Sequence, residues 1–203
     1  MSSVILASTS PWRLDLLRRA GVAARGVAPT CDESAIHHAD PVTLASLRAA
    51  AKAASVRSSV PGVRDAIVIG ADQVAHVDGE AFGKPRDADD HRARLRALRG
   101  RSHVLSVGVT VLHPAGELHF VEHTTVWFRE DLTDALLDAY VDTREGSGCA
   151  GGYAVEGLGA QLIARIDGDW TNVIGLPLFR VIDALRAIGC RPHLSSPPPD
   201  ILP

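Results

Sequence analysis

An uninterrupted apolar segment, Ala66–Ala71, constrains the fold more than any other part of the sequence. A continuous apolar run of this length is typical of a strand that is buried on both faces, and this one ends at Asp72. Such a strand needs other elements packed on both sides of its sheet. The rest of the chain therefore has to supply helices as well as strands.

Helical and strand-like segments alternate along the chain. After the apolar strand Val4–Ala7, Ser10 fits the N-cap and Pro11 the first position of a helix that stops at Gly21. Asp78-Gly79 predicts a hairpin between two short strands, Gln73–Val77 and Ala81–Phe82. Further helices are predicted at Pro41–Ser59, Asp87–Arg99, Thr133–Thr143 and Leu176 to Ile188, and further strands near Val27 and at Val104–Leu112, Leu118–Phe128 and Gln161–Ile166. This interleaving predicts an α/β fold with a mixed sheet.

Composition narrows the class of protein. The chain has 203 residues, 46% hydrophobic and 22% charged, which is typical of a globular protein. No apolar run reaches the ~18 residues of a membrane span, so we expect no membrane association. Three widely spaced cysteines predict reduced thiols and a cytoplasmic location. A net charge of −3 argues against a nucleic-acid coat, and the proline-rich end at Ser195–Pro203 predicts a disordered tail.

Lysine is rare in this chain. Of the 21 basic residues only Lys52 and Lys84 are lysines. Lysine differs from arginine in being a compact point charge with a pKa that shifts readily. We hypothesise that these two positions carry lysine because its compact charge and shiftable pKa matter there. The alternative is that both are surface positions at which any basic residue would serve.

Three motifs match known patterns in the wrong structural context. Gly146–Gly151 matches the dinucleotide fingerprint, but a helix precedes it instead of a strand, which favours a flexible loop. His119 and His123 match an inverted zinc-protease pattern, but on a strand they stand about 13 Å apart, too far for one zinc ion. The five arginines within Arg92–Arg101 are balanced by aspartates, which favours a solvated helix face over a nucleic-acid patch.

The loop before the first helix has the character of an anion site. A helix start offers free backbone N–H groups and normally carries acidic residues. Here Trp12 and Arg13 occupy the first turn, after the hydroxyl groups of Ser8, Thr9 and Ser10. The arrangement suits a phosphate group. The alternative is an exposed arginine without a role.

A second group of charged residues lies near the buried strand. Ligands of open α/β sheets collect beyond the carboxyl ends of strands, where Asp72 is expected. Lys84 follows the hairpin, Lys52 interrupts an alanine-rich helix, and Glu33 lies in the loop before that helix. Together with Arg13, these carboxylates and cations describe a site for a metal-bound polyphosphate.

Five short segments of the chain carry most of these residues, and their order along the chain is informative. They are Ala7-Ser8-Thr9-Ser10-Pro11-Trp12-Arg13, Cys31-Asp32-Glu33, Ala71-Asp72-Gln73, Gly83-Lys84-Pro85 and Asn172-Val173-Ile174-Gly175-Leu176-Pro177. In order and spacing they resemble the Maf family of nucleoside triphosphate pyrophosphatases, whose fold is similar to that of inosine triphosphatase. The resemblance covers residues 3–189.

The resemblance implies a twisted, mixed central sheet flanked by helices, with two lobes and a cleft. Residues 1–189 would form one domain and residues 190–203 a proline-rich tail. The implied reaction cuts a nucleoside triphosphate between its α and β phosphates with a divalent cation, Mg²⁺ or Mn²⁺. The implied binding partner is the small-molecule nucleoside triphosphate, and neither nucleic acid nor a membrane is expected. Whether the chain forms a homodimer is left undecided by the resemblance.

Residue roles follow from the same resemblance. Asp72 matches the proton acceptor, and the polar pocket residues match Ser8, Arg13, Glu33, Lys52 and Lys84. Glu33 and Asp72 are the candidate metal ligands. The chain departs from many members at Leu14, where they carry a second arginine. A phosphate contact is therefore missing there or supplied elsewhere.

Three positions bear on the base. Trp12, Gln73 and Glu156 resemble the branch that acts on 7-methyl-GTP. Stacking on Trp12 suits a cationic methylated guanine, and a carboxylate at Glu156 can accept hydrogen bonds from its N1–H and amino groups. We therefore expect 7-methyl-GTP as substrate. The alternatives are hydrolysis of dTTP, UTP or modified pyrimidine triphosphates, and a non-catalytic nucleotide-binding regulator of septum formation.

Overall fold

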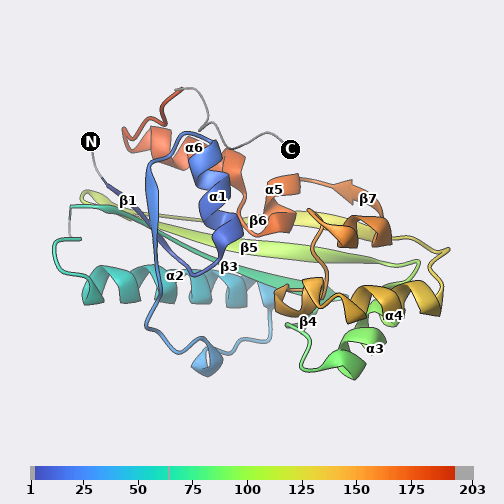
Figure 1. The fold of residues 1–203 in the computed structure, drawn as a ribbon. Helices are drawn as coiled ribbons and strands as arrows, with labels where there is room; N and C mark the ends of the chain where they lie inside the picture. Colours follow the sequence, from blue (N-terminus) through green and yellow to red (C-terminus); the bar gives the residue numbers. More distant parts are fainter. Residues whose placement is uncertain (1–2, 64, 195–203) are drawn as a thin grey trace.

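A seven-stranded mixed sheet forms the centre of the computed structural model, which describes residues 3–63 and 65–194 (Figure 1). The strands are β1 (Val4–Ala7), β2 (Ala24–Val27), β3 (Ile67–Val77), β4 (Glu80–Phe82), β5 (Ser102–His113), β6 (Gly116–Phe128) and β7 (Ile163–Asp167). Their order is β2-β1-β3-β5-β6-β7, and β4 pairs with β3. β1 runs parallel to β2 and β3, whereas the other pairs are antiparallel. The predicted α/β fold with a mixed sheet is confirmed.

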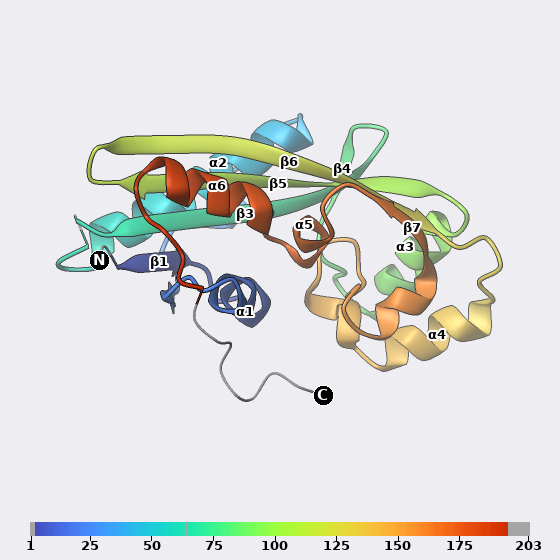
Figure 2. The same cartoon turned by 90° about the horizontal axis from the view of Figure 1, so that it is seen from above.

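Helices cover both faces of this sheet. They are α1 (Pro11–Arg19), α2 (Pro41–Ser59), α3 (Ala88–Leu98), α4 (Asp134–Asp142), α5 (Trp170–Ile174) and α6 (Leu178–Ala187). In Figure 1, α2 lies below the sheet, and α1 and α6 lie above it. Figure 2 shows α3 and α4 at the end of the sheet opposite β1. One apolar core lies under α1 and α6 and a second one lies against α3 and α4, so the molecule has two lobes.

The predicted break at Asp72 is wrong. The strands expected at residues 66–71 and 73–77 are one strand, β3, in which Asp72 pairs with Gly108 of β5. β1 ends opposite Gly70, at Ala7, so only the parallel pairing stops before Asp72. The antiparallel ladder with β5 carries the strand past the aspartate. Asp72 thus lies inside a strand, just beyond the carboxyl end of its parallel neighbour.

Smaller differences concern the C-terminal half. Patterning missed the short helix α5, whose N-cap is Asp169. The strand expected at residues 161–166 begins later, at Ile163, because residues Leu158–Leu162 form a 3-10 helix. The glycine-rich segment contains another 3-10 helix, Glu145–Gly148, instead of an open loop. In the predicted tail, the His193 amide donates to the Gly21 carbonyl, and residues 195–203 lie outside the described residues.

Two glycines let α2 approach the sheet closely. A Cβ atom on Gly70 would lie 2.2 Å from the Ala49 carbonyl oxygen, and one on Gly108 would lie 2.6 Å from the backbone of Ala45. Distances below 3.0 Å do not occur in real contacts, so a side chain at either position would push the helix away. The alanine-rich face of α2 and these glycines therefore set how near Lys52 comes to β3.

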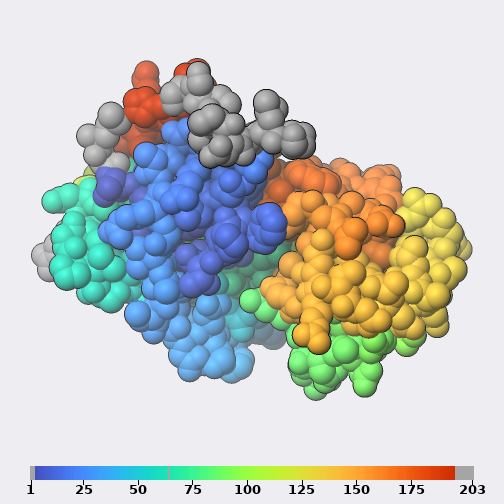
Figure 3. Space-filling model, viewed as in Figure 1, coloured from blue at the N-terminus to red at the C-terminus, as the bar shows by residue number. Residues whose placement is uncertain are grey.

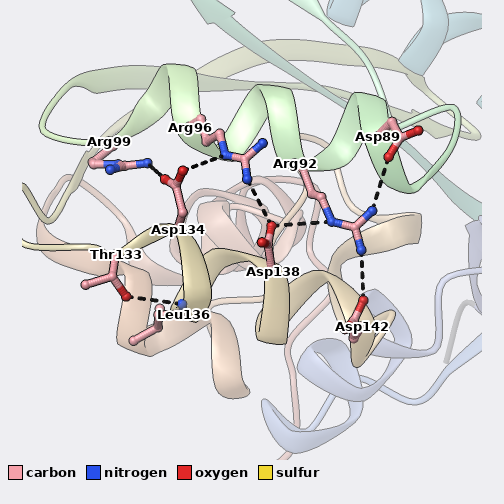
Figure 4. Close-up of polar contacts among 9 residues, drawn as sticks. All are labelled: Asp89, Arg92, Arg96, Arg99, Thr133, Asp134, Leu136, Asp138 and Asp142. Carbon is pink, nitrogen blue, oxygen red and sulfur yellow. Dashed lines mark hydrogen bonds and ion pairs between the residues drawn. The ribbon is translucent and has the colours of Figure 1, made fainter.

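The arginines of α3 pair with aspartates of α4 as well as of α3 itself (Figure 4). Arg92 contacts Asp138 and Asp142, and Arg96 contacts Asp138. The remaining ion pairs of the five arginines are Arg92–Asp89, Arg94–Asp90, Arg96–Asp134, Arg99–Asp134 and Arg101–Asp78. Their charges are thus compensated within the protein, as a structural role requires. Sequence reasoning did not identify the aspartates of α4 as partners.

His119 and His123 both lie on β6, as expected. Their Nδ1 atoms hydrogen-bond to Thr110 and Ser106, respectively, on β5. Within residues 3–63 and 65–194, no three His, Cys, Asp or Glu side chains are arranged to hold a metal ion by themselves. In the same ranges, none of the helices has the length and apolar character needed to span a membrane.

Candidate active site

A cleft of about 690 Å³ separates the two lobes. One side consists of the N-terminus of α1, the loop before α2 and one face of α2, and the other side consists of the turn after β4 and the segment from Glu145 to Glu156. In the space-filling view, the blue N-terminal residues face the orange residues of the second lobe across the middle of the molecule (Figure 3). All nine residues predicted for the site line this cleft: Ser8, Trp12, Arg13, Glu33, Lys52, Asp72, Gln73, Lys84 and Glu156.

The N-terminus of α1 borders the cleft. The Ser8 hydroxyl accepts a hydrogen bond of 3.1 Å from the Ser10 amide, and the Ser10 hydroxyl caps the helix by accepting from the Arg13 amide. The first turn contains no acidic residue. Trp12 stands half-exposed beside it. The helix end thus keeps its partial positive charge available for an anion.

Arg13 is held in place by two backbone carbonyl groups. Its Nε donates to the Gly175 oxygen at 2.7 Å, and its Nη1 donates to the Ala71 oxygen at 3.1 Å. Burial lowers the pKa of Arg13, and the charges of Asp72 and Glu33 oppose that shift. The guanidinium group is therefore a fixed positive charge that joins α1 to β3 and to the end of α5.

Lys52 forms the centre of the charged cluster. Its Nζ lies 2.6 Å from Asp72 Oδ1 and 2.8 Å from Glu33 Oε2, so one ammonium group binds both carboxylates. Lys52 and Asp72 are buried, whereas Glu33 is partly exposed. Glu33 opens a 3-10 helix, Glu33–Ala35, that Asp32 caps. The burial of Lys52 is tolerated because its charge is compensated on both sides.

Two polar side chains on β3 differ in how they are satisfied. Asp72 Oδ2 is buried and has no hydrogen-bond partner among the described residues. The side chain of the next residue, Gln73, donates to the backbone oxygens of Asn172 and Val173 at 2.8 and 3.0 Å. Asn172 itself is fully buried and anchors α5 by donating to the Leu105 oxygen. Gln73 therefore fixes α5 against the floor of the cleft.

The second lobe contributes an exposed lysine and an acidic rim. Lys84 and Glu156 are exposed at the edge of the cleft, and their charges, together with that of Glu145, act on the Cys149 thiol. Burial, and then the charge of Glu156, raises the pKa of Cys149 to about 11. Burial, and further the charge of Glu145, also raises the pKa of Glu156. The cysteine is thus a neutral thiol in this cleft.

Sequence reasoning missed three residues of the cleft. Arg48 lies one turn before Lys52 on α2 and lines the same cavity, with its Nη2 donating to the Ile36 oxygen at 3.2 Å. Its spacing from Lys52 was the available signal. Glu145 accepts hydrogen bonds from the backbone amides of Leu158 and Gly159, at the start of the 3-10 helix that follows Glu156, and Tyr153 lines the wall. Leu14 packs against the core instead, so Arg48 is the additional cation on this side.

Comparisons with known proteins find relatives that match nearly the whole chain. The model of a family described as Maf-like protein matches residues 3–188. A dTTP/UTP pyrophosphatase of Symbiobacterium thermophilum is 41% identical over 93% of this chain and 95% of its own length. A dTTP/UTP pyrophosphatase of Deinococcus radiodurans is 40% identical over 92% of this chain and 93% of its own.

A third relative has a broader name. It is a nucleoside triphosphate pyrophosphatase of a Synechococcus species, 39% identical over 87% of this chain and 96% of its own length. The family match spans both lobes and every element that contributes to the cleft. This chain therefore belongs to the Maf-like protein family.

Proposed function

We propose that this chain is a nucleoside triphosphate pyrophosphatase that hydrolyses dTTP and UTP to the nucleoside monophosphate and diphosphate. The observation that carries the proposal is the Asp72–Lys52–Glu33 cluster, which lies in a cleft beside the N-terminus of α1, whose first turn has no acidic residue. The names of its relatives support the choice of pyrimidine nucleotides. Residues 1–189 act as one catalytic domain in this proposal.

Asp72 is the residue best placed to activate water. It lies at the floor of the cleft, where it accepts the proton of the attacking water molecule. The water oxygen bonds to the α phosphorus, and the bond from that phosphorus to the oxygen bridging to the β phosphate breaks. Lys52, Arg13 and Lys84 hold the negative phosphates, together with Ser8 and the partial positive charge at the N-terminus of α1.

The residues of the cluster fit a divalent cation. Asp72 Oδ2 is a buried oxygen without a partner, and the Glu33 carboxylate lies on the same ammonium group. Mg²⁺ is usually held by one or two carboxylates and by substrate phosphates, which matches a site with two acidic residues. When bound, Mg²⁺ or Mn²⁺ supplies charge neutralisation at the phosphates. Glu33 and Asp72 are the residues that hold it.

The base with which Glu156 can pair depends on whether its carboxyl group is protonated. A protonated carboxyl group donates one hydrogen bond and accepts another, which matches the O4 and N3–H groups of uracil and thymine. An ionised carboxylate only accepts, which matches the N1–H and amino groups of guanine. Because its pKa is raised, Glu156 is protonated to a larger extent than an ordinary glutamate at the same pH. A fall in pH therefore shifts Glu156 towards the form that pairs with uracil or thymine, and a rise in pH shifts it towards the form that pairs with guanine.

7-Methyl-GTP is the second candidate substrate. The observation that favours it is Trp12, whose half-exposed indole ring borders the same cleft as Glu156. A methylated, cationic guanine gains a cation–π interaction of ~1–2 kcal/mol on such a ring when it is desolvated. This candidate needs Glu156 in its ionised form.

A nucleotide panel distinguishes these possibilities. We would measure diphosphate release and kcat/KM for dTTP, UTP, GTP and 7-methyl-GTP with Mg²⁺ or Mn²⁺, at about pH 6 and about pH 8. The proposal predicts dTTP and UTP as the preferred substrates, with a preference that falls as the pH rises. Glu156→Gln should keep the pyrimidine activity and weaken 7-methyl-GTP hydrolysis, and the ratio of the two kcat/KM values should lose the part of its pH dependence that Glu156 causes. The reverse order of substrates would replace pyrimidines by 7-methyl-GTP, and nucleotide binding without hydrolysis would indicate a non-catalytic regulator.

A further inference from the structure

Lys52 occupies an unusual position for a lysine in a phosphate-binding cleft. Its Nζ is within 2.6 Å of Asp72 and 2.8 Å of Glu33, and the side chain is only 8% exposed. A lysine that binds phosphate would point at the anion instead. Here the ammonium group is turned towards the two carboxylates that are the candidate metal ligands.

The Asp72 carboxylate is only half satisfied by this contact. Oδ1 accepts from Lys52, but Oδ2 is buried and has no hydrogen-bond partner among the described residues. A carboxylate has room for about four hydrogen bonds or metal contacts, and a buried oxygen without a partner is costly. The single ammonium charge therefore offsets only part of the negative charge of the two carboxylates, and it does not complete the coordination of Asp72.

An ammonium group and a divalent cation compete for such a position. Both are compact positive charges that favour carboxylate oxygens, and like charges at contact distance repel strongly in a buried site. The lysine side chain is a flexible four-carbon stem, so its charged end can move without a change in the backbone of α2. The cleft into which it would move is the one proposed to hold the phosphates.

We propose that Lys52 is a built-in placeholder for the divalent cation, holding Asp72 and Glu33 together until the metal displaces its ammonium group towards the phosphates. The inference rests on the proposed function, because that function supplies the metal and the phosphates. It assigns two successive roles to one residue. In the metal-free protein Lys52 prevents repulsion between the carboxylates, and in the loaded protein it binds the substrate.

Metal binding without nucleotide tests this proposal. We would titrate wild type, Lys52→Met and Lys84→Met with Mn²⁺ alone and follow free Mn²⁺ by electron paramagnetic resonance. Lys84→Met is the matched control because it removes one positive charge from the same cleft but has no ion pair with Glu33 or Asp72. Lys52→Met should bind Mn²⁺ at least about tenfold more tightly than wild type, and Lys84→Met should stay within about threefold. Equal tightening in both variants, or none in Lys52→Met, would overturn the proposal.

A measurement on the wild-type chain covers the case in which Lys52→Met does not fold. The chain has only two lysines, so labelling lysine side chains with ¹⁵N gives one signal each for Lys52 and Lys84. Adding Mg²⁺ should shift or broaden the Lys52 signal as the buried ammonium leaves its carboxylates. A Lys52 signal that stays unchanged at saturating Mg²⁺ would contradict the exchange. Neither experiment contains nucleotide, so failure here is separable from failure in the nucleotide panel.

Discussion

Lys84 lies in the exposed turn after β4, so its contribution to substrate binding can be separated from any contribution to folding. Lys84→Ala should raise KM for the preferred nucleotide about ten- to a hundredfold, because a hydrogen bond between charged groups is worth ~1.5–3 kcal/mol. The free energy of unfolding should change by less than about 0.5 kcal/mol, as is usual for exposed residues. Steady-state kinetics and thermal denaturation check both statements. Wild-type KM in the variant would mean that Lys84 has no role in binding phosphate.

The lowered pKa of His103 predicts how the free energy of unfolding changes with pH. It is buried, and burial followed by the charge of His76 lowers its pKa to about 4 from the ordinary value of 6.5. In the unfolded chain His103 is protonated as the pH falls below 6.5, whereas in the folded protein it is protonated only near pH 4. The contribution of His103 to stability is therefore complete above pH 6.5, and about 3 kcal/mol of it is lost as the pH falls to 4.

The test is urea denaturation across this pH range. His103→Gln keeps a polar group near Tyr153, to which His103 hydrogen-bonds, but it cannot titrate. Its free energy of unfolding should fall less steeply between pH 6.5 and 4 than that of wild type. His37→Gln, at an exposed position, is the control and should keep the wild-type slope. An identical slope in His103→Gln would show that other groups cause the pH dependence.

At the scale of elements, the packing of α2 on the sheet determines where Lys52 lies. Gly70 and Gly108 provide the space, and α2 has only backbone atoms and one alanine Cβ closest to them. Because the ammonium group has to reach both Asp72 and Glu33, a small outward shift of α2 weakens both contacts. We therefore expect the catalytic rate to be more sensitive to this interface than to other parts of the core.

Gly70→Ala tests that expectation. Its Cβ would meet the Ala49 oxygen at 2.2 Å, so α2 must move, at a cost of about 1–3 kcal/mol in stability. Leu185→Ala, a fully buried residue of α6 on the opposite face of the sheet, should cost a comparable ~2–5 kcal/mol without displacing α2. We expect Gly70→Ala to lose more kcat than Leu185→Ala when both are measured well below their melting temperatures. Equal kcat in the two variants would contradict the role given to α2.

At the scale of the whole molecule, patterning predicts those residues whose chemistry is unusual for their surroundings. A lysine within an alanine-rich helix and an aspartate within an apolar strand signal Lys52 and Asp72 without any knowledge of the fold. The hairpin is also predictable, because Asp78 and Gly79 both adopt the positive φ that its turn requires. Such features are local, so the sequence around them is sufficient.

Features that depend on distant partners are not predictable in this way. The strand does not end at Asp72 because β5 continues to pair with it, and that pairing joins residues far apart in the chain. Arg13 has the motif of a phosphate ligand, yet its Nε is fixed by Gly175, 162 residues away. Arg48 resembles any surface arginine until the face of α2 that borders the cleft is known. The pattern alone contains none of these contacts.

The central claim, that this cleft hydrolyses nucleoside triphosphates with Asp72 as proton acceptor, is tested most directly by Asp72→Asn. An amide keeps the size of the side chain but cannot take the proton of water, and loss of a general base typically costs 10²–10⁴-fold in rate. With dTTP and Mg²⁺, kcat for diphosphate release should fall by that factor while the nucleotide still binds, and Asp183→Asn, at an exposed position on α6, should behave as wild type. Wild-type turnover in Asp72→Asn would contradict the account.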